Sequence, residues 1–187
     1  LKPFKLPGGE AAIHEVWRIG VSLLNELNQT DKYGNFKDLH VVIQMMEKGI
    51  NSPLTNSMGR FFDGVSSLIG IKDNASFEAQ AAMELEFAAI KVAENVTDDL
   101  TNNDYFEFRF EKNSVGEFII DWENIVKGIL YESACDKTKE QIALKFHNTL
   151  VEIISHIAIL SRCDKIVLTG GCFQNKLLLE KAIERLT

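Results

Sequence analysis

The stretch DKIVLTGGCFQNKLLL, residues 164–179, decides the fold class of this chain. Residues 165–169 are almost continuously apolar, which is typical of a strand buried on both faces of a sheet. Gly170 and Gly171 follow, and a helical pattern begins at Asn175. A buried strand, a glycine turn and a helix in this order predict an α/β fold, in which the strand has neighbouring strands.

The rest of the chain is dominated by helical patterns. Apolar residues recur at helical spacing in most segments upstream of residue 164. The sequence FEFRFE alternates in polarity and GEFIID follows it after KNSV, which predicts a β-hairpin over 106–111 and 116–121. Residues 1–10 and 95–104 are predicted as loops. From these patterns we expect an α+β or a helix-rich α/β fold, with helices over 11–27, 37–48, 55–70, 77–94, 122–134, 137–161 and 175–186.

Length, charge and cysteine content restrict the class of protein. The 187 residues suit one domain or the larger part of one. The net charge of −7 disfavours a dedicated nucleic-acid surface, which needs clustered Lys and Arg. Three cysteines without C-x-x-C spacing indicate reduced thiols and a cytoplasmic protein. No apolar run approaches the roughly 18 residues of a membrane helix, so we expect no membrane partner.

The double glycine is the first candidate site. Glycines let a backbone approach a phosphate closely, and unpaired amides at a helix start favour an anion. Asn175 offers both a donor and an acceptor to a nucleotide. The sequence is neither a Walker A motif nor G-x-G-x-x-G. Taken alone, a plain strand-to-helix turn is the better interpretation.

Two further candidates lie on predicted helices. The carboxylate of Asp63 is suited to accept two hydrogen bonds from a ribose diol, but it also suits a solvated acid or an ion pair with Arg60 at i,i+3. Glu78, Ala79 and Gln80 occupy a predicted first helical turn, where small residues permit the approach of a ligand. Glu78 is equally a favourable charge at a helix N-terminus. Glu84 and Glu86 are predicted to be solvated.

Histidine and cysteine give no catalytic assignment. His147 and His156 are nine residues apart on one predicted helix, which places them on opposite faces and excludes a helical metal pair. His14 and His40 are isolated. Cys172 follows the glycines, where a helix N-terminus favours a thiolate, but a partly buried structural thiol is the better interpretation. The catalytic residues stay unknown, and no metal ligands are identified.

Several motifs in order resemble one known family. From about Phe4 to Leu179, the chain resembles the Kae1-like domain of the NiFe-hydrogenase maturation carbamoyltransferase HypF. The resemblance implies the nucleotide-binding fold of actin, sugar kinases and Hsp70. The motifs that carry it are LPGGEAAIHEVWR, NSPLTNSMGRFFDGVSSLIGI, FEAQAAMELE, KFHNTL and VLTGGCFQNKLLL.

The resemblance also implies a chemistry. ATP and carbamoyl phosphate would form a carbamoyl-adenylate, with a divalent metal in the whole protein. The carbamoyl group would then pass to the C-terminal cysteine of a HypE-like partner, for synthesis of the cyanide ligands of hydrogenase.

The family's site residues map onto matching positions here. By resemblance, Gly170 and Gly171 contact phosphates, Asn175 helps to hold the nucleotide and Asp63 binds ribose. Ala79 stands where relatives have a glycine that approaches the nucleoside, which puts that contact in doubt. Glu78, beside it, completes the expected nucleotide site.

The departures from the family pattern are equally informative. Two metal-binding histidines of an earlier segment and the aspartate of a DGG-type motif have no counterpart here. The acylphosphatase-like, zinc-finger and YrdC-like modules are also missing. We therefore expect residues 1–187 to be the second half of a Kae1-like domain, without its N-terminal metal-binding part and its final C-terminal segment. Such a piece should be inactive by itself.

Three alternative functions stay open. An O-carbamoyltransferase of secondary metabolism shares the domain and the intermediate but has another acceptor. A tRNA-modifying relative would carry Pro-Gly-Gly where this chain has FEAQ. A non-catalytic nucleotide-binding or assembly domain would keep the fold alone.

Overall fold

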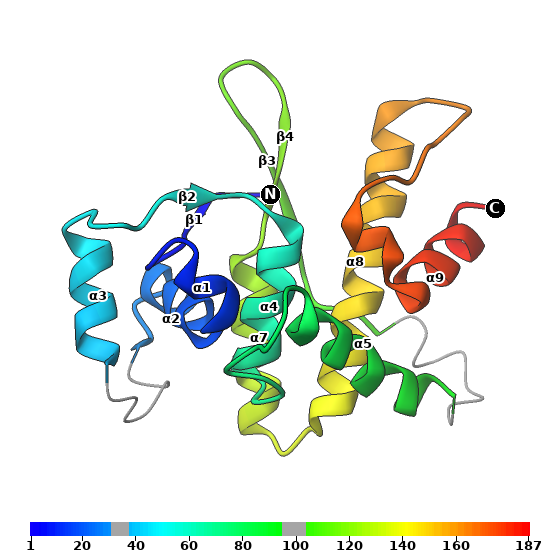
Figure 1. The fold of residues 1–187 in the computed structure, drawn as a ribbon. Coiled ribbons are helices and arrows are strands. Elements are labelled where there is room, and N and C mark those ends of the chain that lie inside the picture. Colours follow the sequence, from blue (N-terminus) through cyan, green and yellow to red (C-terminus); the bar gives the residue numbers. More distant parts are fainter. Residues whose placement is uncertain (31–37, 95–103) are drawn as a thin grey trace.

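The computed structural model describes residues 1–30, 38–94 and 104–187. Helices α1 to α5 are followed by a hairpin and then by α7, α8 and α9 (Figure 1). The elements are β1 (Phe4–Lys5), α1 (Ala11–His14), α2 (Trp17–Glu26), α3 (Leu39–Glu47), β2 (Leu54–Thr55), α4 (Met58–Leu68), α5 (Gln80–Ala93), β3 (Arg109–Lys112), β4 (Phe118–Asp121), α7 (Glu123–Ala134), α8 (Lys139–Ser161), the 3-10 turn η2 (Gly171–Gln174) and α9 (Lys176–Leu186).

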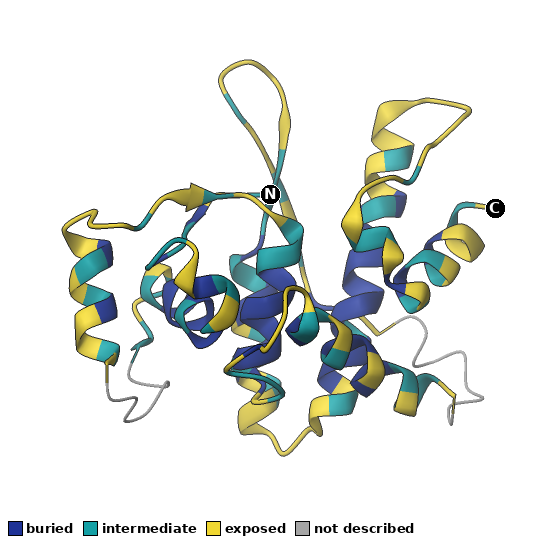
Figure 2. Ribbon diagram, viewed as in Figure 1, coloured by how far each residue is buried: buried dark blue, intermediate teal, exposed yellow. Residues whose placement is uncertain are grey.

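Helix α8 is the centre of the fold. It packs against α5 and α9, while α4 packs against α2 and α5. Its start is fixed by a capping box, in which the Thr138 side chain accepts from the Gln141 amide and the Gln141 side chain accepts from the Thr138 amide. Burial is concentrated where α4, α7 and α8 meet, whereas the hairpin and the last turns of α8 are largely exposed (Figure 2).

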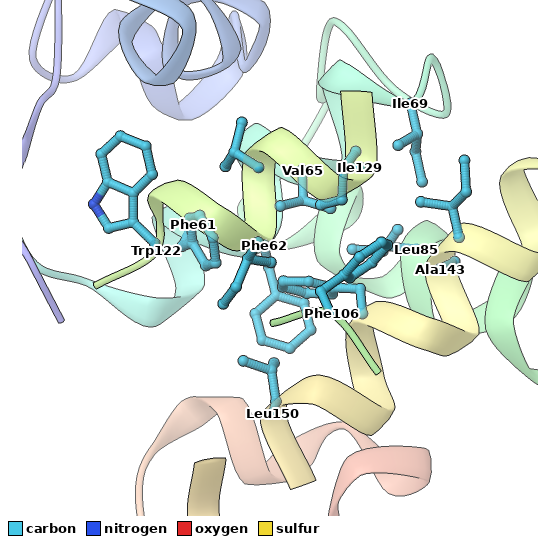
Figure 3. Packing of buried hydrophobic residues seen from close by; sticks show 14 of the residues in the cluster. Phe61, Phe62, Val65, Ile69, Leu85, Phe106, Trp122, Ile129, Ala143 and Leu150 are labelled. Carbon is cyan, nitrogen blue, oxygen red and sulfur yellow. The ribbon is translucent and has the colours of Figure 1, made fainter. Parts of the chain in front are cut away.

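An aromatic cluster joins α4, α7 and α8 in the core (Figure 3). The ring centroids of Phe62 and Phe146 lie 5.1 Å apart, and those of Phe61 and Phe146 lie 5.6 Å apart, both edge to face. Trp122 closes the cluster over Phe61, at 6.3 Å. Such pairs add about 0.5–1.5 kcal/mol each beyond the burial of apolar area, so they fix the position of α4.

The predicted hairpin is confirmed, and a second strand pair was missed. Strands β3 and β4 pair antiparallel, with Phe110 opposite Ile120. Phe4–Lys5 pairs with Leu54–Thr55, inside segments for which no strand was predicted. Strands of two residues are too short to show alternation in the sequence.

The prediction of a buried strand over 165–169 is wrong for this chain. The segment has no regular secondary structure, no strand of the described residues pairs with it, and Val167 is 83% exposed. A continuously apolar strand is buried only when neighbouring strands and covering helices are present. Neither strand pair of the described chain reaches this segment, so its apolar side chains face outward.

Most predicted helices are confirmed within a few residues, as is the helix-rich α/β class. The expected helix over 11–27 is two helices, because the chain breaks at Glu15. The helix expected from residue 77 begins at Gln80, after a left-handed residue at Ala79. The predicted loop 95–104 lies outside the described residues, except for Asp104.

Within the described part of the chain, α8 is the single helix that is long and apolar enough for a bilayer by length and composition. More than half of its apolar stretch is buried inside the protein. That environment is typical of a core helix.

Candidate functional site

One cavity of about 650 Å³ lies between α4, α5 and the turn that precedes α9. This volume is within the range of small-molecule sites. It brings together four of the six residues predicted for the nucleotide site, namely Glu78, Ala79, Gly171 and Asn175. Asp63 and Gly170 do not line it. Arg60 lines the cavity in front of Asp63.

Helix α4 supplies the charged floor of the cavity. Ser57 caps the helix by accepting from the Arg60 amide, and one helical turn separates Arg60 from Asp63. The Arg60 Nη1 and Asp63 Oδ2 atoms lie 3.0 Å apart, without hydrogen-bond geometry. The Arg60 Nη2 donates to Glu78 Oε1 at 3.1 Å. Arg60 therefore bridges two carboxylates, one buried and one with a side chain 73% exposed.

Burial dominates the chemistry of Asp63. The residue is 1% exposed, and this desolvation raises the pKa of its carboxyl from 3.8 to about 6. The Arg60 guanidinium lowers the pKa, Glu78 raises it and the Ala82 amide lowers it, each less than burial raises it. Asp63 is thus the ion-pair partner of Arg60 that the sequence allowed as an alternative. A ligand would meet its carboxylate only after Arg60 moved.

Ala79 marks the start of α5 with an unusual backbone. Its φ of 66° and ψ of 2° are left-handed, a conformation that glycine adopts more easily than alanine. Glu78 therefore precedes the helix rather than lying in its first turn, and its carboxylate reaches Arg60 across the cavity. The two residues line the same cavity as Gly171.

The two glycines have different roles. Gly170 has a φ of 103°, so its backbone itself requires glycine. Gly171 has no such conformation, and a Cβ placed on it would meet no atom within 4 Å. Nothing in the described chain explains glycine at 171, which lines the cavity. In the described residues, neither its amide nor that of Cys172 donates a hydrogen bond.

Side chains of the protein accept hydrogen bonds from two amides at the N-terminus of α9. This corrects the expectation that the amides at this helix start are unpaired and favour an anion. The Asn175 Oδ1 accepts from the Leu178 amide at 2.8 Å, and the Glu86 Oε1 accepts from the Leu177 amide at 3.2 Å. Glu86 is 8% exposed, so the prediction that it is solvated is wrong. The amides of Leu177, Leu178 and Leu179 in α9 are thus occupied, whereas the open amides of Gly171 and Cys172 lie in the turn η2.

Sequence reasoning missed one buried residue behind the cavity. The His147 Nε2 lies 2.9 Å from the Asn175 Nδ2, and the His147 Nδ1 lies 2.7 Å from the Ala143 carbonyl oxygen. The two bonded side chains are 28 positions apart in the chain, and no local pattern links them. The motif KFHNTL, which contains His147, was the single signal available.

Cys172 shows the opposite of a reactive thiol. It is half-buried, and burial raises the pKa of its thiol, with a further increase from Asp63. The interpretation as a structural thiol agrees with this environment. In the ranges 1–30, 38–94 and 104–187, no three His, Cys, Asp or Glu side chains are grouped to hold a metal ion.

Comparison with known proteins assigns the chain to a family. The family model described as carbamoyltransferase, Kae1-like domain, second subdomain matches residues 1–187. The chain belongs to this family. Among curated relatives of the Kae1-like family, carbamoyltransferase HypF of Synechocystis sp. is 35% identical over 209 residues, covering all of this chain and 26% of the relative.

Solved structures agree with the family. A crystal structure of full-length HypF in a phosphate- and nucleotide-bound form matches with a TM-score of 0.85 and 34% identity, over 100% of this chain and 29% of that one. The HypF of T. kodakarensis matches in fold, with a TM-score of 0.78, 24% identity, and 98% and 25% coverage. The chain thus spans about a quarter of the length of these Kae1-like relatives.

Proposed function

We propose that this chain forms the nucleotide-binding wall of a HypF-type carbamoyltransferase. In the proposed reaction, ATP, carbamoyl phosphate and water yield a carbamoyl-adenylate, phosphate and pyrophosphate. The carbamoyl group then passes to the C-terminal cysteine of a HypE-like acceptor in the cytoplasm, and AMP is released. The observation that carries the proposal is the shared cavity of Gly171, Asn175, Glu78 and Ala79, in a chain of the Kae1-like family. A HypF relative has been crystallised in a nucleotide-bound form.

The residues present fit a nucleotide at both ends of the cavity. The open backbone at Gly171 and the Arg60 guanidinium suit phosphate oxygens, since amides and arginine bind them well. Met83 and Phe87 line the cavity and are exposed, which gives an apolar surface suited to a base. Arg60 is thus an electrostatic partner that the sequence analysis did not assign.

The ribose assignment follows from accessibility. Glu78 lines the cavity and can accept hydrogen bonds from a diol without rearrangement. Asp63 reaches the same ligand once Arg60 leaves it for the phosphates, which converts an internal ion pair into a ligand contact. Gly170 acts indirectly in this proposal, because its left-handed backbone aims the turn at the cavity.

The divalent metal of the proposed reaction does not fit this chain. No metal-binding group of side chains occurs among the described residues, so we assign the metal ligands to other segments of the protein and derive no step through them. Residues 1–187 are then one part of the Kae1-like domain and should not catalyse transfer alone. ATP-dependent carbamoylation of a HypE-like acceptor by the 187-residue chain would contradict this.

Gly171→Ala tests the phosphate assignment with little risk to the fold. A Cβ at this position meets nothing within 4 Å and needs no unusual φ, so the melting temperature should be unchanged. In the full-length protein, affinity for a non-hydrolysable ATP analogue should fall at least about tenfold, and further in Gly171→Val. Calorimetry gives the affinity, and hydrogen exchange of residues 171–176 shows whether the nucleotide protects this turn. Unchanged affinity and protection in both variants would reject the assignment.

A further inference from the structure

Asn175 makes two hydrogen bonds that together fix the orientation of its amide. Its Oδ1 faces the Leu178 amide, which can only donate, so the Nδ2 must face His147. The residue is buried and forms part of the cavity wall. The position of Asn175 is therefore set by His147 of α8, a side chain that does not line the cavity.

The same bonds fix the proton on His147. Because Asn175 donates to Nε2, this nitrogen must carry a lone pair. The Nδ1 then carries the proton and donates to the Ala143 carbonyl oxygen at 2.7 Å. Along the path from Leu178 through Asn175 and His147 to Ala143, each nitrogen that donates has one acceptor for one of its N–H groups.

The surroundings hold the ring in place. His147 is fully buried, and the rings of Phe62 and Phe146 stand edge-on to it, with centroids at 5.6 Å and 5.9 Å. Phe62 belongs to α4 and also lines the cavity. A buried polar group is tolerated when all its hydrogen bonds are made, and a rigid ring makes them with little freedom.

We propose that His147 is a positioning residue for the nucleotide site. Through its neutral Nε2, it holds the Asn175 amide so that this residue both caps α9 and fixes residues 171–176 as a wall of the cavity. The inference rests on the proposed nucleotide site but adds a residue outside it. Without an acceptor at the His147 Nε2 position, the Asn175 amide loses the hydrogen bond that orients it and can rotate. Its Oδ1 then no longer caps the Leu178 amide, and residues 171–176 shift in the cavity wall.

Two variants of similar polarity separate this role from packing. His147→Gln keeps an acceptor near the Nε2 position, whereas His147→Asn keeps a donor near the Nδ1 position and leaves Asn175 without a partner. In the full-length protein, we expect the Gln variant to bind a non-hydrolysable ATP analogue within about threefold of the parent. The Asn variant should bind at least about tenfold more weakly, as for loss of one buried hydrogen bond.

Hydrogen exchange supplies a readout that does not need the nucleotide. Exchange of the Leu178 amide should stay slow in the Gln variant and should rise at least about tenfold in the Asn variant, beyond any rise at Leu150 in the middle of α8. Equal exchange at Leu178 in both variants, or a uniform rise at the Leu178 and Leu150 amides, would show that His147 acts only through packing. Either result would overturn the proposal. If the unmutated protein binds no nucleotide, the proposed function fails, while Leu178 exchange still decides whether His147 holds the turn.

Discussion

At the scale of single residues, Ala79 holds a backbone conformation that costs an L-residue about 1–2 kcal/mol. It does so at the edge of the cavity, directly before α5. This left-handed residue explains why the helix begins at Gln80, although a helix was predicted from residue 77.

Ala79→Gly should therefore raise the free energy of unfolding by up to about 1 kcal/mol, since relief of strain exceeds the extra entropy of an unfolded glycine. Chemical denaturation measures this change. Ala82→Gly, inside α5, is the matched control and should lower stability by about 1 kcal/mol. A loss of stability in both variants would show that Ala79 is not strained.

Asp63 makes stability depend on pH in an unusual direction. Its folded pKa of about 6 exceeds its ordinary value of 3.8, so the folded state holds the proton more tightly. The protonated form stabilises the fold below pH 4, and this contribution is lost as the pH rises through 6. Asp63→Asn should match the parent in stability at pH 4 and exceed it by roughly 2–3 kcal/mol at pH 7.5. Denaturation at the two pH values decides the sign; a less stable variant at pH 7.5 would mean that the Arg60 pair outweighs burial.

His147 makes stability depend on pH in the direction opposite to that of Asp63. The pKa of its imidazole is lowered from 6.5 to about 4, chiefly by burial; the Ala143 carbonyl raises this pKa and Lys181 on α9 lowers it, each by less than burial does. The unfolded chain takes up the proton first, so stability is complete above pH 6.5 and is lost as the pH falls towards 4. In Asp63→Asn, where the compensating carboxyl is removed, denaturation midpoints should fall steeply between pH 6.5 and 4. A flat profile in this variant would contradict a buried neutral histidine.

At the scale of elements, the contact of α2 with α4 depends on a glycine. A Cβ on Gly64 would lie 2.8 Å from Leu23 Cδ1 and 2.9 Å from Ile19 Cγ2, distances that force a shift. Gly64→Ala should therefore cost about 1–3 kcal/mol in the free energy of unfolding, despite the better helix propensity of alanine. Gly59→Ala in the same helix meets only Ser57 Oγ at 3.7 Å and should be neutral or stabilising. Equal effects in a denaturation assay would show that α2 yields to the added methyl.

The sequence predicted the positions of the helices better than it predicted which elements pack against one another. Helical periodicity over ten or more residues located α4, α5, α7 and α8, because each buries one face against the core. The segment 165–169 has an equally clear apolar pattern. That pattern indicates that its side chains favour burial, but it does not identify the elements that would cover them. Only the structure could show that its side chains face outward here.

The candidate site was also predicted only in part: the sequence selected residues of the site, but not the contacts that organise them. Local motifs selected Glu78, Ala79, Gly171 and Asn175, and the structure brings them to one cavity. The contacts that organise them span long sequence separations, such as Glu86 with the Leu177 amide, 91 positions apart. Such pairs depend on how α5, α8 and α9 pack, so a single sequence does not reveal them.

At the scale of the whole molecule, apolar side chains gather at one end. Ile159 and Leu160, at the end of α8, are exposed, as are Ile166 and Val167 in the segment that follows this helix. Exposed apolar side chains on a segment that pairs with no strand of the described residues favour association with another chain. The feature belongs to the molecule as a whole, because each residue alone would be unremarkable on a surface.

The isolated 187-residue chain should therefore self-associate, and Val167→Lys should reduce this. Sedimentation velocity across a concentration series measures the effect. Val115→Lys, at an equally exposed position in the hairpin turn, is the control and should leave association unchanged. Equal behaviour of the two variants would place the associating surface elsewhere.

The two tryptophans lie in different hydrophobic clusters. Trp122 belongs to the main core, and Trp17 packs with Val21, Val42 and Met46 between α2 and α3. Both indoles are buried, so each should fluoresce at short wavelength and shift to the red when its own surroundings open to water. With one of them replaced by phenylalanine, the remaining emission reports on a single cluster. The molecule thus carries two built-in optical probes, which can reveal whether α3 detaches before the centre of the protein melts.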